Sequence, residues 1–230
     1  MGSAIDRVRQ FRGLRALVIG DVMLDSYLEG TAARLCSEGP VPVVKKTAEE
    51  RAPGGAANVA TNLRALGADV VLLGLIGRDV PGEILRSRLR DLDIDDRWLV
   101  ADEHVETLHK MRILAAGQYV VRFDEGETRQ HTREGRQRLL AHLDAVFEAC
   151  DLVVVSDYGY GAVSDELLSR LRLLRMARPC VLVVDSKNLQ RFRDMGATMI
   201  TPNHLEAYLT VAPSEPYDRT VDPNKIERIG

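Results

Sequence analysis

The sequence predicts an α/β fold with three layers, α/β/α, in which a mostly parallel central sheet carries a small β-sheet lid. Short apolar runs rich in strand-forming residues alternate with helical patterns along most of the chain. This alternation is typical of an open sheet covered by helices on both faces. Two stretches, 27–51 and 106–123, break the alternation but are rich in strand formers. We expect them to pair into a lid over the strand ends, although two independent surface hairpins would leave the same pattern.

The composition indicates one globular domain. The chain has 230 residues, of which 45% are hydrophobic and 28% are charged, and its net charge is −3. It has no extended basic run and no apolar run of membrane-spanning length, so we expect neither nucleic acid nor a membrane as a partner. The three cysteines have no C-x-x-C spacing and indicate reduced thiols in a cytoplasmic protein. The histidines lack H-E-x-x-H spacing, so we predict no protein-ligated zinc.

The elements follow in order along residues 1–210, and residues 211–230 read as a polar linker or tail. Strand formers bounded by turn residues predict strands at 14–19, 70–76, 152–156, 181–184 and 198–201. Apolar residues at helical spacing predict helices at 5–11, 56–66, 82–92, 134–149 and 165–177, and Asn203 opens another. Ser164 is the expected N-cap of the helix at 165–177, which has acidic residues in its first turn.

A glycine pair precedes the helix at 56–66, in the sequence APGGAANVATNLRALG. Pro53 is expected to stop the preceding segment, and Gly54 and Gly55 let a ligand approach the main chain without meeting a Cβ atom. The free N–H groups of the helix start then point at the turn, where Asn58 can donate and accept hydrogen bonds. An ordinary glycine turn into a buried helix explains the same residues.

Acidic residues follow two of the expected strands. Asp21 and Asp25 lie in GDVMLD after the first strand, and carboxylates are suited to grip vicinal sugar hydroxyls. Asp157 lies in the glycine-rich SDYGYG after a later strand. The alternative is structural for each of them: a turn or cap for Asp21 and Asp25, and a backbone hydrogen bond for Asp157.

Charged residues also follow the last two expected strands. Lys187 can meet a phosphate as a point charge, although a solvated surface lysine is the commoner case. Asn203 and Glu206 have the spacing of a capping box, which explains them structurally. The functional alternative places Glu206 near the water shell of a phosphate-bound Mg²⁺.

Taken together, the segments within residues 14–206 resemble the PfkB/ribokinase family of sugar kinases. The resemblance rests on GDVMLD, PGGAANVA, GRDVPG, SDYGYG, VVDSK and TPNHLE. GDVMLD together with SEGPVPVV resembles the branch that phosphorylates D-glycero-D-manno-heptose 7-phosphate for ADP-heptose synthesis.

The resemblance implies a ribokinase-like fold and an ATP-dependent, Mg²⁺-dependent phosphorylation of the anomeric hydroxyl. It implies a homodimer through the lid, and Arg34, Lys45 and Arg112 as partners of the sugar's 7-phosphate. The substrate-binding set is Asp21, Asp25, Gly54, Gly55, Asn58 and Asp157. The nucleotide-binding set is Lys187, Asn203 and Glu206, with Glu206 also contacting Mg²⁺ through water.

The chain departs from the family pattern in two places. Tyr160 stands where the heptose branch has Lys, and no G-x-G-D, the motif of the family's catalytic base, follows Glu206. We therefore expect an incomplete kinase domain that binds substrate partially, does not turn over and leaves a sheet edge uncovered. The alternatives are a PfkB kinase for another sugar or nucleoside, and a non-catalytic sugar-phosphate-binding remnant.

Overall fold

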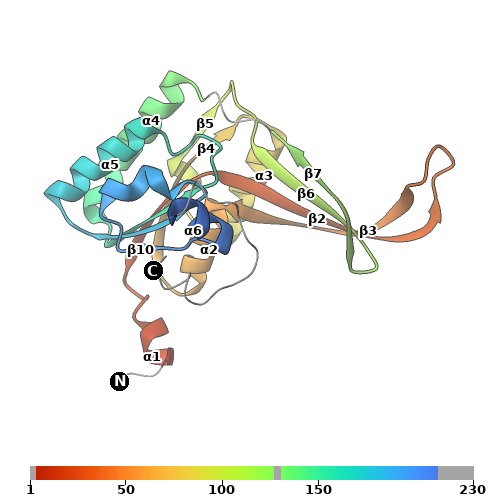
Figure 1. The fold of residues 1–230 in the computed structure, drawn as a ribbon, viewed down its shortest axis with the longest axis horizontal. Helices are drawn as coiled ribbons and strands as arrows, with labels where there is room; N and C mark the ends of the chain where they lie inside the picture. The colour runs from red at the N-terminus through yellow and green to blue at the C-terminus, as the bar shows by residue number, and fades with distance from the viewer. Residues whose placement is uncertain (1–3, 127–130, 212–230) are drawn as a thin grey trace.

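Two sheets organise the fold of residues 4–126 and 131–211, which are the residues described by the structure, a computed structural model. The larger sheet has six parallel strands in the order β10-β9-β8-β1-β4-β5, and the smaller has four in the order β3-β2-β6-β7 (Figure 1). The strands of the larger sheet are β1 (Arg15–Gly20), β4 (Asp69–Gly77), β5 (Leu99–Asp102), β8 (Leu152–Asp157), β9 (Val181–Ser186) and β10 (Met199–Ile200).

Helices cover both faces of the large sheet, which confirms the three predicted layers. Alternate residues of β1 point to opposite faces, so Leu17 and Val18 belong to different apolar clusters. The cluster around Leu17 includes leucines of α4 (Arg133–Val146) and α5 (Asp165–Ala177). The cluster around Val18 includes residues of α2 (Ala56–Ala65) and α3 (Val80–Asp91).

The small sheet is the predicted lid, and its strands do not form independent hairpins. β2 (Val22–Leu35) pairs antiparallel with β3 (Pro42–Gly55) and parallel with β6 (Leu108–Ala115), which pairs antiparallel with β7 (Gln118–Glu125). In Figure 1 this sheet projects from the α/β body, and the β2–β3 hairpin reaches furthest. Because β2 begins directly after β1, the lid starts at the carboxyl edge of the large sheet.

The expectation that Pro53 stops the preceding segment is wrong. β3 continues through Pro53 to Gly55, with Pro53 opposite Leu24. β3 is an edge strand of its sheet, where a residue without an N–H group is tolerated. The chain turns at Gly55 instead, which has a φ of 57° and hands over to α2 through a 2.9 Å hydrogen bond from the Ala56 N–H to the Asp21 carbonyl.

The remaining elements are short. They are α1 (Ala4–Arg9), α6 (His204–Val211) and three 3-10 helices, η1 (Asp96–Trp98), η2 (Phe147–Ala149) and η3 (Leu189–Met195). The Ser164 hydroxyl accepts from the Leu167 N–H at 3.2 Å, so the predicted N-cap of α5 is confirmed. Within the described ranges, no helix is both long and apolar enough to cross a membrane.

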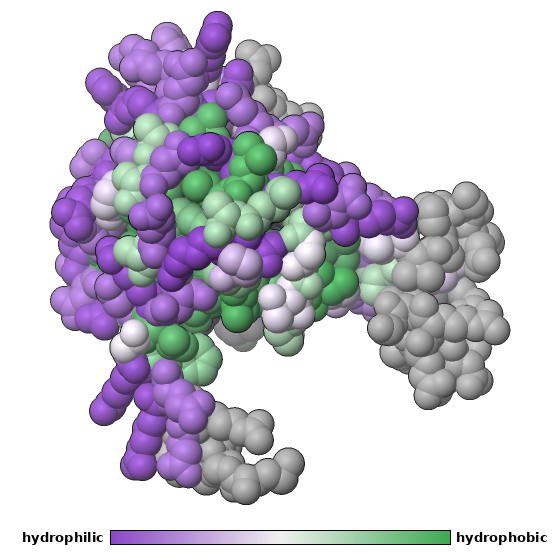
Figure 2. Space-filling view, turned by 90° about the vertical axis from the view of Figure 1, so that its left-hand side faces the viewer, coloured by the Kyte–Doolittle hydropathy of each residue, from purple (hydrophilic) through white to green (hydrophobic). Residues whose placement is uncertain are grey.

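One end of the large sheet is apolar at its surface. Met199 and Ile200 of the edge strand β10 are 58% and 46% exposed, and Leu205 and Leu209 of α6 are also exposed. Figure 2 faces this side of the molecule and shows hydrophobic residues gathered within a mainly hydrophilic surface.

Candidate functional site

The carboxyl edge of the large sheet gathers most of the residues singled out in the sequence. Asp21 follows β1, Tyr158 and Tyr160 follow β8, Lys187 follows β9, and α6 begins soon after β10. The lid strands leave from the same edge. Parallel strands therefore bring polar groups from separate stretches of chain to one rim, where open α/β sheets bind ligands.

Asp21 holds the loop that follows β8. Its side chain is 2% exposed, and its carboxylate accepts from the N–H groups of Tyr158 at 2.8 Å, Tyr160 at 3.1 Å and Ala162 at 3.0 Å. Burial raises the pKa of Asp21, the three hydrogen bonds oppose that rise, and the nearby Asp157 carboxylate adds to it. The structure thus gives the Asp21 carboxylate three main-chain partners.

Asp25 is better placed to meet a ligand. The Arg112 guanidinium donates to its Oδ1 at 2.7 Å and thereby has its own pKa raised, while the Asp25 side chain keeps 18% of its surface exposed. The other carboxylate oxygen lies against Gly54, where a Cβ atom would collide with it. Gly54 therefore lets the Asp25 carboxylate lie on the backbone of β3.

Asn58 lies one turn into α2 and is exposed. The Asn62 side chain donates to its Oδ1 at 3.4 Å, a long contact that leaves the amide able to reorient. Gly55, Asp21 and the start of α2 are in direct contact, so the predicted glycine, carboxylate and helix start do lie together.

The Asp157 side chain, at the end of β8, is buried and hydrogen-bonded within the protein on the other side of the same loop. It is 4% exposed and accepts from Arg191 at 2.9 Å, from the Ser186 hydroxyl at 3.1 Å and from the Gly159 N–H at 3.0 Å. These bonds join β8, β9 and η3. Its hydrogen bonding agrees with the structural alternative for this residue.

Lys187 lies beside two tyrosine rings and a second lysine. Its ammonium is 5.8 Å from the ring centre of Tyr158 and 5.7 Å from that of Tyr160. Lys110 of β6 reaches the same rings at 5.6 and 5.2 Å. Lys110 is not among the residues predicted from the sequence, although strand alternation places it on the same lid face as Arg112.

Asn203 and Glu206 form the capping box at the start of α6. The Asn203 N–H donates to Glu206 Oε2 and the Glu206 N–H donates to Asn203 Oδ1, both at 2.9 Å. Burial raises the pKa of Asp185, at the end of β9, and the Glu206 carboxylate adds to that rise. Burial also raises the pKa of Tyr158, and Asp185, Asp25 and Glu206 add to it. One network of charges therefore reaches from the lid to α6.

Two of the three basic residues assigned to the 7-phosphate lie far from Asp25. Arg34 is nine positions further along β2, about 30 Å at the usual rise of about 3.3 Å per residue. Lys45 pairs with Thr31, about 20 Å along the same strand. Arg112 is the only one of the three in contact with Asp25.

The lid has one charged face and one apolar face. Directly opposed residues share a face, so Asp25, Tyr27, Lys110, Arg112 and Arg122 lie together. The other face carries Leu28, Met111, Ile113, Val121 and Phe123. Because Lys110 contacts the tyrosines of the body, the charged face looks toward the rim and the apolar face looks away from it.

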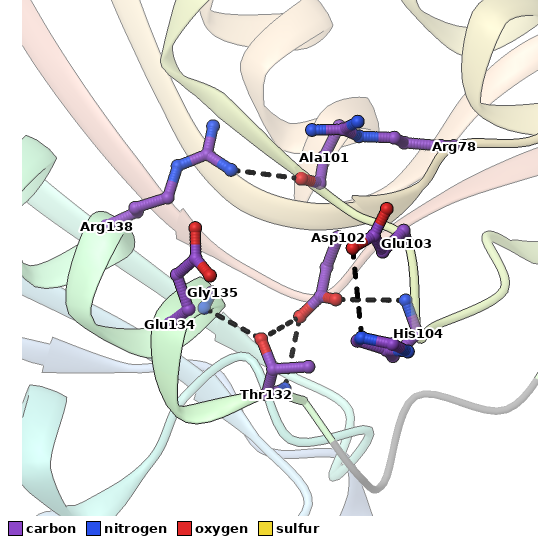
Figure 3. Close-up of a pocket in the computed structure, with 9 residues that line it drawn as sticks. All are labelled: Arg78, Ala101, Asp102, Glu103, His104, Thr132, Glu134, Gly135 and Arg138. Atoms are coloured by element: carbon purple, nitrogen blue, oxygen red, sulfur yellow. Dashed lines mark hydrogen bonds and ion pairs between the residues drawn. The ribbon is translucent and has the colours of Figure 1, made fainter.

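A small hollow of about 140 Å³ lies at the end of β5, and none of the predicted site residues lines it (Figure 3). At its floor the Asp102 carboxylate accepts from the Thr132 hydroxyl at 2.6 Å and from the N–H groups of Thr132 and His104. These bonds lower the pKa of Asp102 against the opposing effect of burial. Asp102 thus joins β5 to the start of α4, which is a structural role.

Comparison with known proteins gives a family match over most of the chain. The pfkB family carbohydrate kinase profile matches residues 14–224. The bifunctional protein HldE of Shewanella baltica (strain OS155 / ATCC BAA-1091) is 40% identical over 197 residues, which cover 85% of this chain and 40% of that protein. HldE of Desulfatibacillum aliphaticivorans is 36% identical over 200 residues, or 87% of this chain and 41% of that protein. The chain spans about two fifths of the length of these relatives.

Solved structures share the fold. Phosphofructokinase-2 from Escherichia coli, in complex with substrates and products, superposes with a TM-score of 0.70 and 20% identity, over 94% of this chain and 67% of that one. The protein Sa239 superposes with a TM-score of 0.68 and 18% identity, over 95% and 68%.

Proposed function

The chain belongs to the pfkB family of carbohydrate kinases, and on this premise we propose that it handles D-glycero-D-manno-heptose 7-phosphate and ATP, with the anomeric hydroxyl as acceptor. The choice of sugar is supported by the resemblance of GDVMLD and SEGPVPVV to the heptose branch. The identity of 36–40% to HldE proteins over about 200 residues is consistent with that branch.

The observation that carries the proposal is the setting of Asp25. Its carboxylate lies between Arg112 and the bare backbone of Gly54, on the lid face that looks toward the rim. A partly exposed carboxylate held in this way can accept hydrogen bonds from sugar hydroxyls and fix their orientation. Asp21 and Asp157 support this site indirectly, because both fix the loop that carries Tyr158 and Tyr160.

The residues at the nucleotide side are compatible with ATP and Mg²⁺. Lys187 is exposed, and Asp185 and Glu206 are two carboxylates close enough to raise the pKa of Asp185. A bound cation would relieve that repulsion, and Mg²⁺ usually keeps several waters and takes one or two carboxylates. When bound, ATP supplies the phosphoryl group and Mg²⁺ neutralises its charge.

The proposal includes a homodimer through the lid and a cytoplasmic location. The apolar lid face supports the first, since such a face is more stable when covered. The second is supported by Cys36, Cys150 and Cys180, which are free thiols in the structure.

The test is sugar binding by calorimetry, which measures the affinity of the site for the sugar directly. We expect the heptose 7-phosphate to bind and Asp25→Asn to weaken it by at least tenfold, about 1.4 kcal/mol. The control is Asp69→Asn, because Asp69 is an exposed residue at the N-terminal end of β4, at the edge of the large sheet opposite to the site. Thermal melts check that both variants fold.

The other outcomes separate the alternatives. Tighter binding of a nucleoside or of another sugar phosphate would replace the heptose with that substrate. Sugar-dependent release of ADP by this chain would exclude the alternative of a non-catalytic remnant. It would also show that the expectation of no turnover is wrong. Failure to bind any phosphorylated sugar at millimolar concentration would refute the proposal.

A further inference from the structure

Two lysines from different sheets meet over the same pair of aromatic rings. Lys110 comes from β6 of the lid, and Lys187 follows β9 of the body. Both ammonium groups lie within 6 Å of the ring centres of Tyr158 and Tyr160. The lid and the body therefore meet here at a pair of tyrosine rings, which two positive charges approach.

Neither lysine of this contact is held by an ion pair in the described ranges, although the carboxylates of Asp185, Asp25 and Glu206 lie close enough to add to the rise in the pKa of Tyr158 that burial causes. Asp25, which lies opposite Lys110, is already paired with Arg112. The rings attract each ammonium, but like charges that share two rings also repel each other. A group with two or more negative charges placed between them would remove that repulsion.

We propose that Lys110 and Lys187 form a phosphate clamp, in which a bound phosphate draws the lid onto the body. The ligand class is a phosphate monoester or the terminal phosphate of a polyphosphate. Lysine binds such groups as a point charge, without the bidentate geometry of arginine. The inference rests on the proposed function, since it places one of that reaction's phosphates between the lid and the body.

Other groups of the site are consistent with the clamp. Of the cations on the β6–β7 part of the charged face, Arg112 pairs with Asp25 and Arg122 pairs with Asp124, which leaves Lys110. The Tyr158 phenol is protonated at neutral pH, as tyrosine ordinarily is, so its hydroxyl can donate to a phosphate oxygen. Lys110 also supplies, from the lid, a positive charge next to Tyr160.

The experiment measures binding of four probes to the full chain: heptose 7-phosphate, unphosphorylated heptose, ATP and tripolyphosphate. We expect Lys110→Gln to weaken at least one phosphate-bearing probe by tenfold or more and to leave unphosphorylated heptose within twofold. Lys110→Arg should recover most of the loss. The matched control is Lys46→Gln, because Lys46 is an exposed lysine of β3 that pairs opposite Gly30, and this variant should leave the binding of every probe unchanged.

The pattern of losses identifies the phosphate. A loss confined to heptose 7-phosphate assigns the clamp to the sugar, and a loss confined to ATP and tripolyphosphate assigns it to the nucleotide. If the wild type binds no heptose 7-phosphate but binds ATP through Lys110, the proposed sugar is wrong and the clamp stands. Unchanged binding of every phosphate-bearing probe by a folded Lys110→Gln variant would overturn the clamp. If that variant does not fold, the salt dependence of binding by the wild type is the test. The clamp would be overturned if the affinities for ATP and heptose 7-phosphate did not fall with added salt.

Discussion

The Asp21 carboxylate shows how one buried side chain can fix a loop of the candidate site. Its two oxygens accept three N–H groups from a loop more than a hundred residues away in sequence. Because burial raises its pKa above 3.8, the stabilisation from this group is complete below pH 3.8 and falls as the pH rises through the native pKa. The carboxylate is nevertheless retained, since an uncharged side chain offers fewer acceptors to the loop.

We predict that Asp21→Asn destabilises the protein. One oxygen of Asn can still accept from Tyr158 and Tyr160, but its NH₂ group then faces the N–H of Ala162. A buried donor left without an acceptor costs roughly 1–3 kcal/mol. Denaturant unfolding should show this loss, whereas Asp69→Asn at the surface should change stability by about 0.5 kcal/mol or less. Equal stability of the two variants would contradict the role of Asp21 in holding the loop.

His131 gives a second prediction, on pH dependence. The residue is 5% exposed, and burial lowers its pKa from 6.5 to about 4. Between these values the unfolded chain binds the extra proton, so stability is lost as the pH falls from 6.5 to about 4, by roughly 3 kcal/mol in total. His131→Gln should flatten that part of the stability profile. His104→Gln, at an exposed histidine, should leave the slope unchanged.

At the scale of elements, the start of α6 allows two explanations of Glu206. Glu206 accepts from the Asn203 N–H in the capping box, and the proposed function also places it near Mg²⁺. Glu206→Gln keeps a capping acceptor but removes the charge, so its melting temperature should stay close to that of the wild type. Glu206→Ala removes both the acceptor and the charge and should lower the free energy of unfolding by about 1 kcal/mol.

Binding then separates the two roles of Glu206. If the carboxylate acts on Mg²⁺, Glu206→Gln should weaken Mg²⁺-dependent ATP binding by tenfold or more. Unchanged ATP binding by this stable variant would leave Glu206 with the cap alone.

The elements that the sequence predicts well are those whose signal is local. The strand at 152–156 has a continuous apolar run because both of its faces are buried, and Ser164 marks its helix by a local cap. β5 was missed because its four residues, Leu99–Asp102, follow a charged 3-10 turn and are too short to show a period. The expectation for Pro53 is wrong because a proline is acceptable there only in an edge strand. That β3 is an edge strand follows from the tertiary structure and cannot be seen in the local sequence.

The sequence predicts the position of the candidate site more directly than the role of each side chain. Strand ends and glycines locate the rim, so Asp25, Gly54 and Lys187 were named from the sequence. The partners of Asp21 and Asp157 come from distant loops, which no spacing reveals. The sequence does not single out Lys110, because its pairing opposite Asp25 arises only within the lid sheet and its approach to Tyr160 arises only when the lid meets the body.

At the scale of the whole molecule, the lid must satisfy two environments at once. Its charged face looks toward the rim, and its opposite face exposes Val121 and Phe123 at 49% and 54%. These residues alternate along β7, an edge strand whose free N–H and C=O groups also face outward. An apolar face on an open edge favours association with a second copy of the same lid.

We therefore predict that the protein is a dimer through this face and that Val121→Glu dissociates it. A glutamate at Val121 would place a charge among Ile113, Phe123 and their counterparts in the second copy, without a partner for it. Arg122→Glu is the matched control, because Arg122 is the exposed neighbour of Val121 and pairs opposite Arg112 on the charged face. Sedimentation over a range of micromolar concentrations should give a dimer for the wild type and for Arg122→Glu, and at least tenfold weaker association for Val121→Glu. A monomeric wild type, or equal association of the two variants, would mean that the apolar lid face is not the contact between copies.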